Sequence, residues 1–141
     1  MTYDENNVFA KVLRGEIPCH RIYEDDDTLA FLDIMPRADG HALVVTKEKA
    51  ADLFDISPSG LAKLMAAVQK LAPKITEAMG ADGVLIQQFN GAAAGQTVFH
   101  LHVHIIPRKE GVALKPHAGK MADPAALAAT AEKIRKKLGQ G

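Results

Sequence analysis

The longest helical pattern in the chain runs from Ser57 to Gly80. Ser57 is a typical N-cap residue, Pro58 suits the first helical position, and Gly80 suits a helix end. Pro73 lies inside the pattern and lacks the N–H that its turn requires, so a kink is predicted there. Apolar residues at spacings of three and four give this helix one apolar face: Leu61, Leu64, Met65, Val68, Leu71, Ile75 and Met79.

Two shorter helices are predicted near the ends of the chain. The first runs from about Asn6 to Arg14 and stops at Gly15, with four apolar residues on one side: Val8, Phe9, Val12 and Leu13. Asp123 and Pro124 open the second, which ends in a basic turn and places four residues inward: Leu127, Ala131, Ile134 and Leu138.

Five apolar runs between these helices are typical of β-strands. "RIYEDD" and "TLAFLDI" flank the acidic turn Asp25–Asp27 and predict a hairpin, and "HALVVTK" predicts a third strand. "GVLIQQFN" and "VFHLHVHIIPR" predict two more strands, whereas "KEGVALKPHAGKM" predicts an irregular loop. Short links between strands, with helices outside them, predict an α+β domain on a mainly antiparallel five-stranded sheet.

Composition narrows the class of protein. At 141 residues, 48% hydrophobic and 24% charged, the sequence predicts a single globular domain over residues 1–141. Seventeen Lys and Arg balance seventeen Asp and Glu, so neither nucleic acid nor an anionic membrane is an expected partner. The start has no apolar signal region, no apolar run approaches the roughly 20 residues that cross a bilayer, and Cys19 is the only cysteine. These features predict a cytoplasmic protein without an internal disulfide.

Three histidines alternate with aliphatic residues in "HLHVHII", residues 100–106. A strand places alternate side chains on opposite faces, so His100, His102 and His104 are predicted to share one face. Three interpretations compete: a polar strand face, a metal site and a catalytic surface. Imidazole is a good ligand for zinc, and His41 could join two of these histidines, although cysteine pairs at zinc spacing are missing.

The catalytic interpretation accounts best for three adjacent imidazoles. A neutral histidine can attack phosphorus, while neighbouring imidazolium groups can stabilise phosphoryl charge and donate a proton to the leaving group. The small-residue stretch "NGAAAGQT", residues 90–97, leads into the histidines and could aim backbone N–H groups at the same phosphate. The pattern therefore favours nucleophilic chemistry at phosphorus, with the metal site as an open alternative.

These residues resemble a known family. "AGQTVFHLHVHIIPR" resembles the signature of the histidine-triad (HIT) superfamily of nucleotide hydrolases and transferases. "FAKVLRGEIPCHRIYEDDDTLAFLDIMPRADGHALVV" is similar to the amino-terminal half of its Hint-like branch, and the matching stretches span about residues 7–108. Residues 109–141 then form a C-terminal loop and helix. The resemblance implies the HIT fold, a purine nucleotide substrate and a homodimer paired through the long helix and a central strand.

The resemblance also implies a role for each matching residue. His102 would attack the α-phosphorus and carry the nucleotidyl group, and His104 would contact the α-phosphate and assist in proton transfer. The product would be AMP or another nucleoside monophosphate, and no cofactor is implied. Also implied are catalytic roles for His100, His41 and Thr97, a ribose contact for Asp33, phosphate contacts for Asn90, Gly95, Gln96 and Thr97, and a base cleft of Val8, Phe9, Val12, Ile17, Phe31 and Ile34. His20 and His117 receive no role.

Two features depart from the family pattern. Many bacterial members bind zinc through a Cys-x-x-Cys pair, but Asn7 and Ala10 occupy those positions here, so we expect no bound metal. "GQTV" and "PRK" resemble the dinucleoside polyphosphate hydrolase branch, whereas the longer amino-terminal match is similar to the phosphoramidate hydrolase branch. The leading prediction is a HIT-family hydrolase of one of these types. A nucleotide-binding regulatory module with little turnover is the alternative, although the presence of His102 favours an enzyme.

Overall fold

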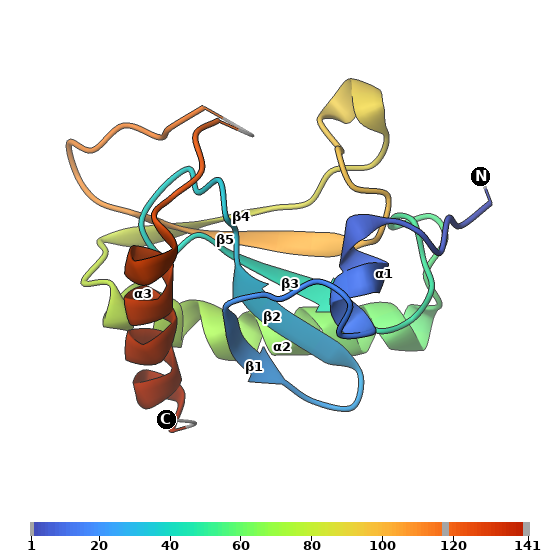
Figure 1. The fold of residues 1–141 in the computed structure, drawn as a ribbon, viewed down its shortest axis with the longest axis horizontal. Helices are drawn as coiled ribbons and strands as arrows, with labels where there is room; N and C mark the ends of the chain where they lie inside the picture. Colours follow the sequence, from blue (N-terminus) through green and yellow to red (C-terminus); the bar gives the residue numbers. More distant parts are fainter. Residues whose placement is uncertain (1, 117–118, 140–141) are drawn as a thin grey trace.

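The computed structural model describes residues 2–116 and 119–139 and confirms the predicted α+β class. Five strands form one antiparallel sheet in the order β1-β2-β3-β5-β4 (Figure 1). Among the described residues, none of the helices has the length and apolar character of a membrane-spanning segment. The elements are α1 (Val8–Leu13), β1 (Arg21–Glu24), β2 (Thr28–Leu32), β3 (Ala42–Thr46), α2 (Pro58–Ala78), β4 (Gly83–Gln87), the 3-10 helix η1 (Ala92–Ala94), β5 (His102–Arg108) and α3 (Pro124–Leu138).

The helices begin close to the predicted positions for local reasons. The side chain of Asn7 accepts a hydrogen bond from the backbone N–H of Ala10 at the start of α1. The side chain of Ser57 caps α2 in the same way, and α2 continues as one helix through Pro73. The α3 helix starts at Pro124, as its proline predicts.

The last two strands are shorter than the sequence pattern predicts. β4 ends at Gln87, and β5 begins at His102 rather than at Val98. Residues 98–100 form bends instead of continuing the strand, and the backbone N–H of Leu101 donates to the carbonyl of Ala50. His100 therefore lies outside the strand in which it was predicted.

The predicted irregular loop after β5 has neither helix nor strand in its described residues, 109–116 and 119–121. Residues 117 and 118, and with them His117, lie outside the described residues.

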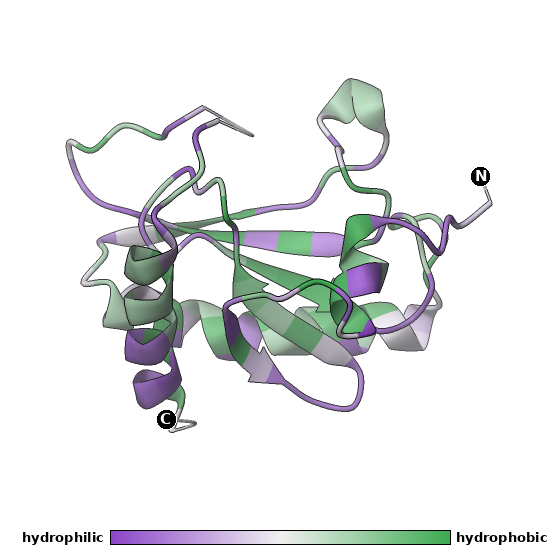
Figure 2. Cartoon of the chain, viewed as in Figure 1, coloured by the Kyte–Doolittle hydropathy of each residue, from purple (hydrophilic) through white to green (hydrophobic). Residues whose placement is uncertain are grey.

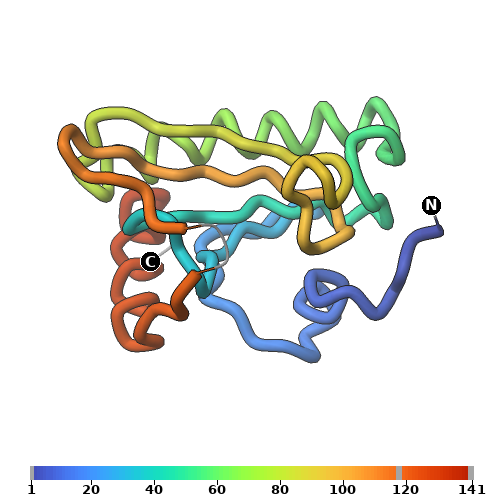
Figure 3. The backbone as a smooth tube through the Cα atoms, turned by 90° about the horizontal axis from the view of Figure 1, so that it is seen from above, coloured from blue at the N-terminus to red at the C-terminus, as the bar shows by residue number. Residues whose placement is uncertain are grey.

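The sheet separates two apolar clusters. Strand residues pack with α2 and α3 into the larger cluster, which includes the predicted inward residues Leu127, Ala131 and Ile134 of α3. Phe9 of α1 belongs to the smaller cluster on the opposite face. Figure 3 shows the strands between α2 and α1, and Figure 2 shows β5 with alternating hydrophobic and hydrophilic bands. The apolar residues of β5 thus face the larger cluster, whereas its histidines face the side of the sheet on which α1 lies.

Candidate active site

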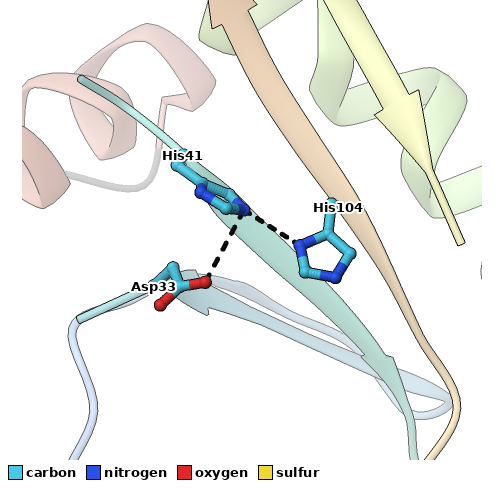
Figure 4. A group of neighbouring side chains, drawn as sticks. All are labelled: Asp33, His41 and His104. Atoms are coloured by element: carbon cyan, nitrogen blue, oxygen red, sulfur yellow. Dashed lines mark hydrogen bonds and ion pairs between the residues drawn. The ribbon is translucent and has the colours of Figure 1, made fainter. Parts of the chain in front are cut away.

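Two strands and the loop between β2 and β3 bring the predicted polar residues together. His102 and His104 extend from β5, with only 9% and 4% of their surface exposed. Asp33 follows β2 directly and His41 precedes β3, and the backbone N–H of Asp33 donates to the carbonyl of His41. This backbone bond holds the two side chains opposite each other, and both point toward His104 (Figure 4).

Hydrogen bonds determine which nitrogen of His41 carries its proton. The backbone N–H of Arg37 donates to Nδ1 of His41 at 3.0 Å, so the proton of the neutral ring is on Nε2. That Nε2 lies 2.9 Å from Nδ1 of His104 and 3.6 Å from Oδ2 of Asp33. Because His41 donates to Nδ1 of His104, the neutral His104 ring carries its own proton on Nε2, on the far side of the ring (Figure 4).

His102 has the opposite arrangement. Its Nδ1 lies 2.6 Å from the backbone carbonyl of His100. A carbonyl oxygen can only accept a hydrogen bond, so Nδ1 carries the proton and Nε2 keeps a lone pair. The ring of Phe9 packs edge-on against His102, and the His102 and His104 ring centroids are 5.0 Å apart. A nitrogen able to attack and a nitrogen able to donate therefore belong to neighbouring rings.

His100 supports this pair from behind the cavity rather than lining it. Its Nε2 donates to the carbonyl of Thr46, and its Nδ1 accepts from the hydroxyl of Tyr3, both at 2.6 Å. Burial lowers the pKa of His100, and the bond to Thr46 opposes that shift only in part. A neutral His100 thus holds the backbone carbonyl that orients His102.

A cavity of about 250 Å³ opens in front of His102 and His104. Asp33 and Thr97 are part of its wall. The wall also contains every residue that the resemblance assigns to the base cleft: Val8, Phe9, Val12, Ile17, Phe31 and Ile34. Cys19 also lines the cavity and was not predicted, and burial raises the pKa of its thiol. Cys19 has no spacing signal in the sequence that could have marked it as a wall residue.

The residues predicted to surround the phosphate are placed differently from one another. Thr97 lines the cavity, whereas the buried side chain of Gln96 donates to the carbonyls of Ala51 and Val98. The side chain of Asn90 accepts a backbone N–H from the loop before α2. Neither Gln96 nor Asn90 lines the cavity, so both shape the loop that carries Thr97.

Gly95 and two residues missed by the sequence analysis complete the surroundings. Gly95 has a φ of 105°, which L side chains rarely adopt, and lets the loop turn before the site. Phe89 packs on the ring of His104 with centroids 5.3 Å apart, and Tyr3 reaches His100 from the N-terminal segment. Both are single aromatic residues in irregular segments, where periodicity gives no signal.

One group of side chains has the composition of a metal site. Asp33, His41 and His104 each offer one ligand atom, and these atoms lie within 4.8 Å of one another. A bound ion would replace the hydrogen bond between His41 and His104, whose nitrogen atoms now face each other. The residues therefore suit a proton network and, after a change of that bond, a cation.

Comparison with known proteins gives a consistent result. The HIT domain family matches residues 14–111. The chain is 43% identical over 109 residues to adenylylsulfatase HINT3 of Arabidopsis thaliana, which covers 77% of this chain and 55% of that protein. It is 42% identical over 101 residues to adenosine 5'-monophosphoramidase hnt1 of Schizosaccharomyces pombe, which covers 72% of this chain and 73% of that protein.

The fold agrees with these matches. The crystal structure of a Hit-like protein from Bartonella henselae superposes with a TM-score of 0.90 at 48% identity, over 96% of this chain and 99% of that one. The chain spans only about half the length of the Arabidopsis relative. Domain match, sequence identity and fold together show that the chain belongs to the HIT family.

Proposed function

We propose that this protein is a purine nucleotide hydrolase or nucleotidyl transferase that works through a covalent nucleotidyl group on His102. The observation that carries the proposal is the opposite protonation of two neighbouring rings, with a lone pair on Nε2 of His102 and a proton on Nε2 of His104. Relatives named an adenylylsulfatase and an adenosine 5'-monophosphoramidase support a nucleotide as substrate.

The first step forms a bond from Nε2 of His102 to the α-phosphorus. The bond between phosphorus and the leaving group breaks, and the leaving group departs with a proton taken from water at the open side of the cavity. Positive charge then develops on the His102 ring, where the carbonyl of His100 faces Nδ1–H. The Nε2–H of His104 donates to a phosphoryl oxygen, and His41 keeps that tautomer in place.

The second step is hydrolysis of the phospho-histidine. Water attacks the phosphorus, the bond to His102 breaks, and the nucleoside monophosphate leaves with the water oxygen. The proton lost by that water returns to the solvent, so the two steps together consume one water and regenerate the neutral ring. An amine or phosphate acceptor in place of water would make the same protein a transferase.

Trapping the intermediate tests the proposal. We expect acid-free quenching during turnover of adenosine 5'-phosphoramidate to show the chain with one added adenylyl group by intact mass. The His102→Ala variant should show none. Turnover by the natural protein without an adduct, combined with near-normal turnover by the variant, would remove His102 from this role. Nucleotide binding without any AMP release would instead support the regulatory-module alternative.

The apolar wall suits a purine base, and the Asp33 carboxylate beside it suits the ribose hydroxyls. The side chain of Asp33 is 19% exposed, and its Oδ1 accepts the backbone N–H of Met35. Cys19 is the only cysteine and lies in the same wall, so it reports on occupancy. We expect AMP to slow alkylation of Cys19 by iodoacetamide, and equal rates with and without AMP would place the base elsewhere.

Metal binding is a second candidate function, because three potential ligands converge at Asp33, His41 and His104. It predicts a stoichiometric ion by elemental analysis of the purified protein and loss of that ion in His41→Ala. Full turnover after treatment with a chelator, with no ion in the protein, would reject it.

We also propose that a second copy of the chain covers β4 and the exposed side of α2. β4 is an edge strand, and Val84, Ile86 and Met65 are 38%, 39% and 43% exposed. Met65 and Ile86 line one apolar hollow, and an uncovered apolar edge strand invites pairing. The variant Met65→Glu/Ile86→Glu should be a monomer by light scattering, whereas Val112→Glu, at another exposed apolar residue, should stay dimeric. A monomeric natural protein would contradict this.

A further inference from the structure

The segment before α1, residues 2–7, reaches the histidines from behind the cavity. The hydroxyl of Tyr3 lies 2.6 Å from Nδ1 of His100, and the two rings meet edge-on with centroids 5.6 Å apart. Because the Nε2–H of His100 donates to the carbonyl of Thr46, Nδ1 of the neutral ring accepts the proton of the tyrosine hydroxyl. The residues that line the cavity in front of His102 do not include Tyr3.

These two hydrogen bonds fix the ring of His100. β5 begins at His102, and its pairing with β3 begins at the same residue, so His100 lies outside the ladder. Its buried ring is held instead through both nitrogens, by Thr46 on one side and by Tyr3 on the other. A ring with a single bond could turn about that contact, whereas bonds at both nitrogens define its plane. Tyr3 is therefore one of two side-chain contacts that hold the residue before β5.

The carbonyl of His100 in turn determines the tautomer of His102. Nδ1 of His102 lies 2.6 Å from this carbonyl, and a proton on Nδ1 leaves the lone pair on Nε2, the atom proposed to attack phosphorus. If the carbonyl moved, a neutral His102 could carry its proton on Nε2, and the attacking nitrogen would then have no lone pair. A chain of contacts thus runs from Tyr3 through His100 to His102.

The N-terminal segment is tied to the rest of the site at two further points. The carboxylate of Glu5 binds the ammonium group of Lys49 in the loop after β3, beside which the segment lies (Figure 1). The segment continues into α1, where the ring of Phe9 packs edge-on against His102. The start of the chain therefore supports His102 twice, at its ring through Phe9 and at its hydrogen-bond partner through Tyr3.

We propose that Tyr3 is a positioning residue for the nucleophile: its hydroxyl holds His100, whose carbonyl keeps the proton of His102 on Nδ1. The inference rests on the proposed function and adds to it a residue outside the cavity. A phenol suits this place, because its hydroxyl can donate to a neutral imidazole while its ring packs against the same imidazole. Loss of the hydroxyl should slow the chemical step and leave substrate binding unchanged.

Steady-state kinetics with two tyrosine variants tests the inference. Tyr3→Phe removes only the hydroxyl and should lower kcat with adenosine 5'-phosphoramidate about threefold to tenfold, the effect of one hydrogen bond, with KM changed less than about twofold. Tyr23→Phe is the matched control, because Tyr23 is the only other tyrosine and its hydroxyl donates to Asp25. Tyr23 belongs to the larger apolar cluster, so this variant should keep the natural kcat.

Nitrogen NMR of histidine-labelled protein gives a readout that a purely structural role would not change. At about pH 8, where histidines are neutral, His102 should show the Nδ1–H tautomer alone in the natural protein and in Tyr23→Phe. Tyr3→Phe should show a mixture of both tautomers at His102. In a His100→Leu background, Tyr3→Phe should change kcat less than about twofold, because the partner of the hydroxyl is gone.

Four results would overturn the inference: a natural kcat in Tyr3→Phe, a lower kcat with an unchanged tautomer of His102, a rise in KM alone, or the full loss of kcat in the His100→Leu background. If the natural protein does not cleave the phosphoramidate, the proposed function fails, and the NMR comparison then decides alone. A mixture of tautomers in Tyr3→Phe supports the positioning role, and a single Nδ1–H tautomer rejects it.

Discussion

The two faces of β5 show how differently one strand can be used. Val103 and Ile105 face the main core, where they are at most 2% exposed and pack with residues of α2 and α3. His102 and His104 face α1 and are almost as deeply buried. The covering helices differ in length, with 21 residues in α2 and 6 in α1. The short helix covers only part of its face, and the remaining space is the cavity.

The two faces of β5 therefore serve different purposes, one the stability of the fold and the other the proposed chemistry. The core face stabilises the fold by burying apolar side chains, so its contribution to the free energy of unfolding is expected to depend on burial alone. In the proposed mechanism the histidine face needs particular hydrogen-bond partners, because each ring has to carry its proton on one defined nitrogen. Substitutions on the two faces should therefore change different measurements.

The largest expected effect compares two residues of β5 on opposite faces, His102 and Ile105. We expect His102→Ala to lower kcat/KM for AMP release about 10³-fold or more, because a covalent route requires its nucleophile. Ile105→Ala should instead lower the free energy of unfolding by about 2–5 kcal/mol, with activity of the folded protein nearly unchanged. Urea denaturation and initial rates measure both. Similar profiles for the two variants would remove the distinction between the faces.

The second prediction concerns His41, which is as buried as the core but belongs to the histidine face. His41→Leu puts an apolar side chain at this buried position and removes both hydrogen bonds, so His104 loses its defined tautomer. We expect kcat/KM to fall about 10²-fold or more, in the range found for loss of one hydrogen-bond donor to a developing oxyanion. The buried N–H of Arg37 also loses its partner, which should cost about 1–3 kcal/mol of stability. A stable variant with near-normal rates would show that tautomer control is unimportant.

The third prediction compares two glycines with positive φ. Gly40 precedes His41, has a φ of +86°, and a Cβ there would lie 2.6 Å from Cγ of Met79 at the end of α2. Gly15 has a φ of +78° with no described atom within 4 Å of such a Cβ. We expect Gly15→Ala to cost about 1–2 kcal/mol from backbone strain alone. Gly40→Ala should cost about 1–3 kcal/mol more through overpacking. Equal midpoints in urea would contradict a close contact between this turn and the core.

The smallest expected effect is a pH dependence of stability from His100. Burial lowers its pKa, so the unfolded chain takes up this proton at a higher pH than the folded protein does. The contribution of His100 to the free energy of unfolding is therefore fully present above the pKa of the unfolded chain, about 6.5, and is lost as the pH drops below that pKa. Urea midpoints at about pH 7.5 and pH 5.5 should show a decrease on acidification. His100→Gln should show a smaller decrease, and an equal one would assign the effect to other groups.

Much of the architecture was predictable because it follows from local patterns. Apolar spacing located α2, and alternation located β5 and assigned His102 and His104 to one face. His100 was placed in the same strand because alternation continues through it. The prediction was wrong there, because residues 98–100 form bends and Leu101 bonds to the distant Ala50, a contact that local alternation does not record.

The site was less predictable wherever it depends on distant contacts. Tyr3 bonds to His100 across 97 positions of the chain, and neither residue has a local signal for the other. Gln96 and Asn90 were assigned to the phosphate from their place in the motif, and that assignment stays a prediction, whereas the bonds of their side chains to neighbouring loops had no signal in the sequence. A motif specifies residue type and order, whereas the direction of each side chain depends on the backbone around it.

Periodicity and residue type were thus enough to establish the class of fold and the histidine strand, and to predict nucleophilic chemistry. They could not establish which nitrogen of each ring carries a proton, because that depends on partners such as Arg37 and His41, which lie 67 and 63 positions from His104 in the chain. Nor could they reveal that Arg37, Arg108 and Lys115, which are far apart in the chain, line one cavity. Local spacing records the geometry of helices and strands, whereas hydrogen bonds and cavities between distant segments exist only once the chain has folded.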